Sequence, residues 1–275
     1  MARLVQTGGR IQRKQAIPIP LLPMVATALL AVFVLAPWPL AHKAHALLHG
    51  LCAQRPSHSF ALGGTLLPFD ARMTGIYGGF ATTALWLLLK GRLSAWRLPP
   101  RPVVLVLAAF VAALAVDGGN ALLLDIGAAP LYPPDNRLRV ATGALTGIAL
   151  AVSVCHVLAT ALWRSGDRQT ATVRGPGEVA MLALVQVPLV AVALSGWGVL
   201  YAPLTLLLVC SATVVVGSLT LACLTMLRLR DGTYGSAADL QGAAALSLVV
   251  GLVVMGVIAG ARFWAERAFG IVPLT

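Results

Sequence analysis

Long apolar runs alternate with short polar segments along most of the chain. A helix needs about 20 apolar residues to cross the hydrocarbon core of a bilayer, so each long run predicts one transmembrane helix. Seven runs qualify: residues 17–40, 73–89, 103–116, 138–163, 179–200, 204–227 and 240–258. The pattern therefore predicts an all-α fold, a polytopic bundle of seven transmembrane helices.

The same pattern predicts how the helices are connected. Residues 103–116 form the shortest run, which reaches spanning length only if Asp117 and Asn120 continue the helix into surrounding protein. The apolar residues 121–126 are too few to cross, and are expected at the membrane interface or in a re-entrant segment. Only residues 201–203 separate the fifth and sixth runs, which favours a tight helical hairpin.

Three parts follow from this organisation. Residues 1–16 are expected to form a basic cytoplasmic tail, residues 17–163 a four-helix unit with two patterned outer loops, and residues 164–275 a three-helix extension. The basic start and Ala44-His45-Ala46 also resemble a signal peptide with its cleavage site. A retained anchor is favoured because the first apolar run contains several prolines and is longer than a signal peptide requires.

Composition supports the membrane class. Hydrophobic residues make up 59% of the 275 residues and charged residues only 11%, whereas a soluble domain has about 25% charged residues. This excludes a soluble globule, a disordered chain and a nucleic-acid-binding domain, despite the net charge of +11. Most lysines and arginines lie in the tail and at residues 90–101, 164–174 and 228–230. The positive-inside rule then places the N-terminus in the cytoplasm and the C-terminus outside.

The outer loops carry a recognisable set of motifs. Residues 52–60 read CAQRPSHSF and residues 68–79 read PFDARMTGIYGG; Asp117-Gly118 follows, and then Asn136, Arg139, Thr142 and Gly143. Over residues 48–150 the chain resembles a family of small prokaryotic membrane proteins, domain of unknown function 2085. Its pattern is C-H-x-x-P-x-R-S-F, then P-x-C-x-R-C-T-G-I-Y-x-G. The resemblance implies a multi-pass protein of a prokaryotic cell membrane and no known activity.

Departures from that pattern concern chemistry. Ala53 stands where the family pattern has histidine, and Asp70 and Met73 stand where it has two cysteines. Three thiolates and an imidazole would be a credible zinc site. If the family binds metal with those residues, this chain is expected to bind none, or to bind it differently.

Two arginines mark the leading candidate site. Arg72 and Arg139 each precede a Thr-Gly pair, formed by Thr74 and Thr142 with their glycines, at the start of an inward-running helix. Helix N-termini and guanidinium groups both favour anions. These residues, organised by Asp117, Asp70 and Asn136, are therefore expected to bind an anionic lipid headgroup or a partner protein. The alternative is internal pairing with Asp70, Asp117, Asp125 or Asp135, because charges at membrane depth are normally paired.

The glycines predict helix packing. Gly75 and Gly79, and likewise Gly143 and Gly147, form G-x-x-x-G pairs, which allow close approach of helix backbones. The second and fourth runs are thus expected to pack together, as an internal repeat in one interpretation. Residues 256–260 contain a further such pair.

A metal site is the alternative chemistry. His42, His45, His49 and Cys52 recur at helical spacing, and with Asp70 they could hold zinc or copper. The simpler interpretation is an amphipathic helix at the interface. No cofactor is expected otherwise, and His156 in the fourth run is interpreted as a packing residue.

Three functional hypotheses result. The leading one is a non-enzymatic binding or accessory protein, with membrane lipids as partners and other membrane subunits contacting residues 179–262. The second is a metalloprotein or enzyme using Cys52, Asp70 and nearby histidines. The third is a small-solute or proton-coupled transporter using Asp117 and the arginines. Nucleotide-binding motifs and nucleic-acid partners are not expected.

Overall fold

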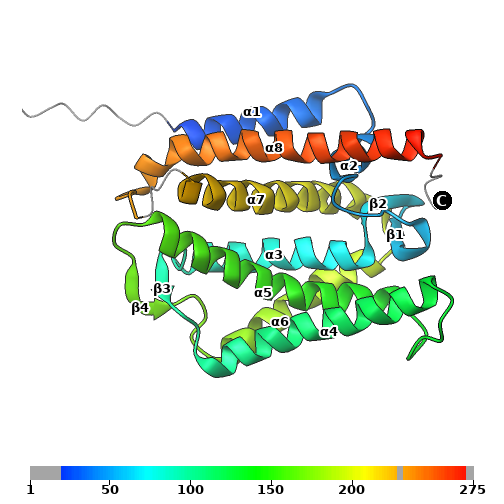
Figure 1. The fold of residues 1–275 in the computed structure, drawn as a ribbon, viewed down its shortest axis with the longest axis horizontal. Helices are drawn as coiled ribbons and strands as arrows, with labels where there is room; N and C mark the ends of the chain where they lie inside the picture. The colour runs from blue at the N-terminus through cyan, green and yellow to red at the C-terminus, as the bar shows by residue number, and fades with distance from the viewer. Residues whose placement is uncertain (1–19, 228–231, 271–275) are drawn as a thin grey trace, which may run out of the picture.

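The computed structural model describes residues 20–227 and 232–270. The helices lie side by side along a common direction, and small strands and loops lie at the two ends (Figure 1). The predicted tail at residues 1–16, like the cationic residues 228 and 230, lies outside the described residues.

The helices are α1 (Leu21–Leu35), α2 (Leu40–Leu48), α3 (Ala71–Leu89), α4 (Arg101–Asp125), α5 (Asn136–Leu162), α6 (Pro176–Leu194), α7 (Tyr201–Leu227) and α8 (Ala237–Ala268). The strands are β1 (Ser59–Leu62), β2 (Thr65–Asp70), β3 (Ala95–Arg97) and β4 (Asp167–Ala171), and the short 3-10 helices are η1 (Pro56–His58) and η2 (Gly198–Leu200).

Five helical segments among the described residues are long and apolar enough to cross a membrane, judged by length and composition: α4, α5, α6, η2 with α7, and α8. The expected number, seven, is not confirmed. Helix α1 has only 15 residues, because Pro37 and Pro39 end the first apolar run early. Helix α3 has 19 residues, but with Arg72 and several glycines and threonines it is not apolar enough to join these five.

Helix α4 is longer than the predicted run at residues 103–116. It continues through Asp117 and Asn120, which are both buried, and ends at Asp125. Residues 121–125 are the last turns of α4 and Ile126 is its C-cap, so they do not form a separate re-entrant segment, which was one of the two expectations. Helix α8 likewise extends beyond residues 240–258 in both directions.

The predicted hairpin between the fifth and sixth runs does not form as expected. Tyr201, Ala202 and Pro203 are the first turn of α7, where proline is tolerated because the backbone N–H has no helical partner. The link is instead the segment after Leu194, including η2. Helices α6 and α7 pack on α3 and α5 rather than on each other.

The fold is mostly helical, as expected, and two small sheets accompany the helices. Strands β1 and β2 form an antiparallel hairpin with Leu62 opposite Thr65. Gly63 and Gly64 connect them with φ angles of +58° and +79°, which suits a tight two-residue turn. Strands β3 and β4 pair in parallel at the opposite end, where the buried Arg92 contacts both carboxylate oxygens of Glu178 at 2.6 and 2.8 Å.

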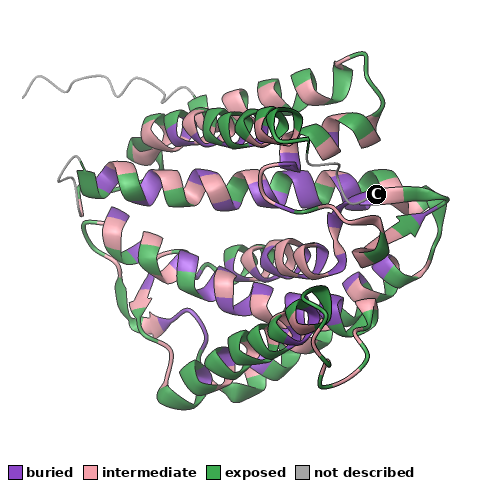
Figure 2. Ribbon diagram, turned by 45° about the vertical axis from the view of Figure 1, so that its right-hand side comes forward, coloured by how far each residue is buried: buried purple, intermediate pink, exposed green. Residues whose placement is uncertain are grey.

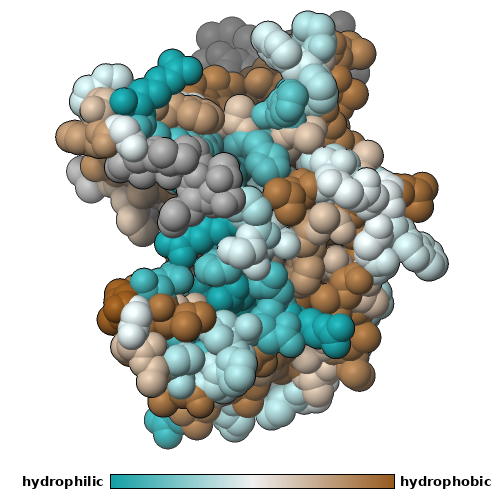
Figure 3. Space-filling view, turned by 90° about the vertical axis from the view of Figure 1, so that its right-hand side faces the viewer, coloured by the Kyte–Doolittle hydropathy of each residue, from teal (hydrophilic) through white to brown (hydrophobic). Residues whose placement is uncertain are grey.

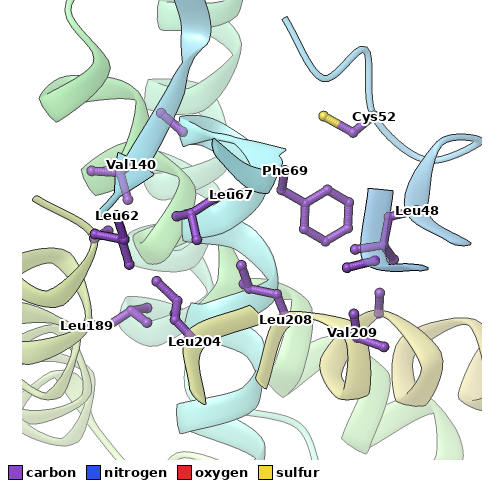
Figure 4. Packing of buried hydrophobic residues seen from close by; sticks show 14 of the residues in the cluster. Leu48, Cys52, Leu62, Leu67, Phe69, Val140, Leu189, Leu204, Leu208 and Val209 are labelled. Carbon is purple, nitrogen blue, oxygen red and sulfur yellow. The ribbon is translucent and has the colours of Figure 1, made fainter. Parts of the chain in front are cut away.

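The hairpin's second strand closes one end of the core. Phe69 and Leu67 of β2 are almost completely buried against Leu48 of α2 and Leu208 of α7 (Figure 4). Elsewhere the buried residues lie where helices meet, and the outward faces are exposed (Figure 2). Large apolar side chains such as Leu105 and Val257 lie on those outward faces, as expected for surfaces covered by lipid.

Helices α3 and α5 make the closest contact of the bundle. A Cβ atom added at Gly143 would overlap the carbonyl oxygen of Arg72, and one added at Gly75 would overlap that of Val140. Gly79 and Gly147 face the carbonyl oxygens of Ala144 and Ile76 in the same way. By contrast, Gly256 and Gly260 have open space around them within the described residues. No other described helix therefore packs closely on the glycine pair at residues 256–260.

We expect Gly143→Ala to lower the stability of the protein by about 1–3 kcal/mol, the usual cost of overpacking, because the new methyl group meets backbone atoms that cannot move independently. Thermal unfolding in detergent measures the effect. Gly256→Ala is the matched control, since it adds the same methyl group in open space. Equal melting temperatures for the two variants would contradict the described α3–α5 contact.

Candidate anion site at the hairpin end of the bundle

Helices α3 and α5 both begin at the end that carries the hairpin, and each begins with an aspartate cap. An Asp70 carboxylate oxygen accepts a hydrogen bond from the backbone N–H of Met73 at 2.8 Å. Asp135 accepts one from the N–H of Arg137 at 2.8 Å. Aspartate is a favoured N-cap residue, so this signal was readable in the sequence. The caps place Arg72 and Arg139 in the first turns of their helices.

Arg72 forms an ion pair with a buried carboxylate. Its Nη2 lies 2.7 Å from Oδ2 of Asp117, whose side chain is 2% exposed. The hydroxyl of Tyr132 donates to the other oxygen of Asp117 at 3.3 Å. For Arg72, the structure thus contains the internal pairing that was the alternative to a ligand.

Arg139 lacks such a pair. It is 6% exposed, and its Nη1 donates to Oδ1 of Asn136 at 2.8 Å. Its Nε is buried without a partner, as is Nε of Arg72. Among residues 20–227 and 232–270, no carboxylate lies within 4.0 Å of Arg139. The two guanidinium groups therefore share one nearby carboxylate, that of Asp117, and one positive charge has no opposite charge at ion-pair distance. A buried charge without an opposite charge is costly.

We call Arg72 and Arg139 the guanidinium pair. Contacts between neighbouring loops lie beside it. Asn136 donates from Nδ2 to the carbonyl oxygen of Ser57 at 3.1 Å, and so links α5 to η1. Arg55 pairs with Asp125 at the end of α4, at 2.6 Å. Polar residues gather over the middle of this end of the molecule (Figure 3).

The predicted threonines do not contribute free hydroxyl groups. Thr74 donates to the carbonyl oxygen of Phe69 at 3.3 Å. Thr142 donates to the carbonyl oxygen of Leu138 at 3.0 Å, four residues back along its own helix. Both hydroxyl groups therefore satisfy backbone acceptors in the described structure.

Asn120 has a structural role that sequence reasoning missed. It is 1% exposed, its Oδ1 accepts from the N–H of Leu131 at 2.6 Å, and its Nδ2 donates to the carbonyl oxygen of Tyr132 at 2.9 Å. These bonds fold the α4–α5 loop back over Asp117. Only the long-range fold reveals this partner, because a lone asparagine in an apolar run gives no local signal.

The candidate metal ligands are held in hydrogen bonds. Helix α2 ends at Leu48, so Cys52 does not continue the predicted histidine stripe. The Sγ atom of Cys52 accepts backbone N–H groups of Gln54 and Asp70, each at 3.4 Å, and burial raises the pKa of this thiol to about 12. Nε2 of His45 lies 3.4 Å from the carbonyl oxygen of Leu66. The described part of the chain contains no group of three His, Cys, Asp or Glu side chains that could hold a metal ion.

A second polar cluster joins α8 to the loop after α2. His49 lies between Gln54 and Glu266, with both contacts at 2.9 Å. Glu266 also accepts from Nε of Arg262 at 2.8 Å. Arg262 in turn donates to the carbonyl oxygens of His49, at 2.6 Å, and of Cys52. The i,i+4 pair on α8 was visible in the sequence, but its partners were not.

Comparison with known proteins addresses the part of the chain that builds the guanidinium pair. Residues 52–153 match the family described as predicted membrane protein DUF2085. This confirms the resemblance inferred from the motifs. The DUF2085 segment, residues 52–153, includes the hairpin, α3, α4 and most of α5, and therefore both arginines. No curated protein and no solved structure matches the chain.

Within the DUF2085 segment, the positions where the family pattern has cysteines lie together. The backbone N–H of Asp70 donates to Cys52, and the carboxylate of Asp70 caps the helix at Met73. The carboxylate of Asp70 thus binds the backbone of the helix that it caps, whereas Arg72 pairs with Asp117.

We expect Asp117→Asn to destabilise the protein by about 3–5 kcal/mol, since removing one member of a buried ion pair leaves the other charge unmatched. Asp125→Asn is the control, because its pair with Arg55 is about one-third exposed on both sides and such pairs contribute about 0–1 kcal/mol. Chemical unfolding in detergent measures both. The assignment fails if Asp117→Asn is no more harmful than Asp125→Asn.

Proposed function

We propose that this protein is a non-enzymatic membrane protein whose guanidinium pair binds the phosphate of an anionic lipid headgroup. One observation carries the proposal: Arg139 is buried and has no carboxylate partner within ion-pair distance among the described residues. A phosphate oxygen would supply the missing opposite charge and accept from the unused N–H groups.

The membrane placement belongs to the same proposal. We infer that α1 and α3 also cross the bilayer, which gives seven crossings. Trp38, Trp197 and Trp264 are about two-thirds exposed and lie at the hairpin end, as expected for an interfacial aromatic belt. The loops at the opposite end carry an excess of arginine and lysine. This supports a cytoplasmic N-terminus, with the guanidinium pair on the outer side of a prokaryotic cell membrane.

A lipid is favoured over a partner protein by the surroundings of the site. The last turns of α4, which carry Asp117 and Asn120, also expose Val116, Leu122 and Leu124. A headgroup bound at the guanidinium pair would leave its acyl chains beside this apolar face.

The other hypotheses remain predictions with less support. A metal site at Cys52, Asp70, His45 and His49 would first have to break hydrogen bonds that hold the loop. Transport through Asp117 would have to break its pair with Arg72. Contacts with other membrane subunits through residues 179–262 rest on composition alone.

Native mass spectrometry of the detergent-purified protein tests the proposal. We expect wild type to retain phosphatidylglycerol, and Arg139→Gln to bind it at least about tenfold more weakly, since a charged hydrogen bond is worth about 1.5–3 kcal/mol. The matched control is Arg137→Gln, which removes the same charge from an exposed position on the same helix. Equal lipid retention by the two variants would refute the proposal. Stoichiometric zinc or copper without lipid would favour the metalloprotein hypothesis instead.

A further inference from the structure

A short turn, η1, lies beside Arg139 and carries His58. Asn136 connects the two: its Oδ1 accepts from Arg139 at 2.8 Å, and its Nδ2 donates to the carbonyl oxygen of Ser57 at 3.1 Å. His58 follows Ser57 directly and is the last residue of η1. The backbone of this turn is also fixed, because the N–H of His58 donates to the carbonyl oxygen of Arg55 at 3.0 Å.

The imidazole of His58 is half-buried, and neither ring nitrogen forms a hydrogen bond or ion pair with any residue of the described ranges. The charged groups that act on it come from four different parts of the chain. They are Arg139 of α5, Arg55 of the preceding loop, Asp125 at the end of α4 and Asp70 at the end of β2. Burial and then the two arginines lower the pKa of His58, and the two carboxylates only partly oppose them. The lowered pKa favours the neutral imidazole in the free protein.

We infer that His58 is a third donor to a phosphate group held by Arg72 and Arg139, and that it takes up a proton when that phosphate binds. The inference rests on the proposed function, and it adds a residue whose protonation changes the affinity of the site for phosphate. A bound phosphate offsets the positive charge of Arg139, which after burial is the strongest influence that lowers the pKa of His58. Protonated imidazole has two N–H donors and no acceptor, so it suits an anion better than the neutral ring does.

Proton uptake fixes the direction of the pH dependence. The anion-bound protein has the higher His58 pKa, so it binds more protons than the free protein at intermediate pH. By linkage, the affinity for phosphate is greatest below the pKa of the free protein. It declines as the pH rises through the pKa of the complex.

The test uses probes whose own charge does not change between about pH 5 and pH 8, the range in which histidine titrates. Dioctanoyl phosphatidylglycerol and dimethyl phosphate are both singly charged phosphodiesters, one a lipid and one freely soluble. Their dissociation constants for the detergent-purified, full-length protein are measured at both ends of this range. A shift of one pKa unit corresponds to about a tenfold change in affinity, which is the size we expect for wild type.

Two histidine variants separate the outcomes. His58→Gln is expected to keep the affinity measured at the alkaline end and to lose the increase at the acid end. His42→Gln, at an exposed position of α2 near the same end, is expected to behave as wild type. If dimethyl phosphate binds with the same pH dependence, the inference is supported and the ligand can be a soluble phosphate compound. If only the lipid binds in a pH-dependent way, the inference is supported and the ligand is a lipid headgroup.

Several results would overturn it. If wild type binds phosphatidylglycerol equally well at both pH values, or if His58→Gln retains the dependence, the inference about His58 fails and the proposed function stands. If neither probe binds, or if Arg139→Gln binds as wild type does, the proposed function itself fails. The side-chain NMR signal of His58 gives an independent readout, since its midpoint must move to higher pH when the probe is present.

Discussion

The contact between α3 and α5 determines most of what lies at the hairpin end. Gly143 packs against the backbone carbonyl of Arg72, one helical turn from Arg139. The helix crossing thereby holds the first turns of α3 and α5, which carry these two like charges, next to each other. Asp117 compensates one of them from α4. The unusual electrostatics of this end are therefore a consequence of glycine packing further inside the bundle.

Much of the fold was predictable because it depends on local periodicity. The apolar runs at residues 138–163 and 204–227 became α5 and α7 with nearly the expected ends. The hairpin was missed although Gly63-Gly64 between two apolar stretches is a turn signal. The first apolar run is longer than α1 because Pro37 and Pro39 follow the last turn and prevent the helix from continuing. Helix α4 was underestimated because Asp117 and Asn120 look like loop residues until their buried partners are known.

The residues of the candidate site could be predicted from the sequence, but their hydrogen-bond and ion-pair partners mostly could not. Arg72, Arg139, Asp117 and Asn136 do come together. Which arginine takes the carboxylate, and that Asn136 also reaches Ser57, depend on how segments distant in sequence are placed. The same holds for Cys52 and Asp70: their spacing suggested ligands, whereas the fold gives both of them backbone N–H groups to accept. Local composition has no information on such pairings.

The hydrogen bonds that Arg262 donates to the carbonyl oxygens of His49 and Cys52 have a consequence for biosynthesis. More than two hundred residues separate these partners along the chain. The loop after α2 is made early, but its last hydrogen bonds can form only after α8 has been translated and inserted. Until then the carbonyl groups at the end of α2 and the ring of His49 have no protein partner from α8. The loop after α2 is therefore completed last, by the helix that is synthesised last.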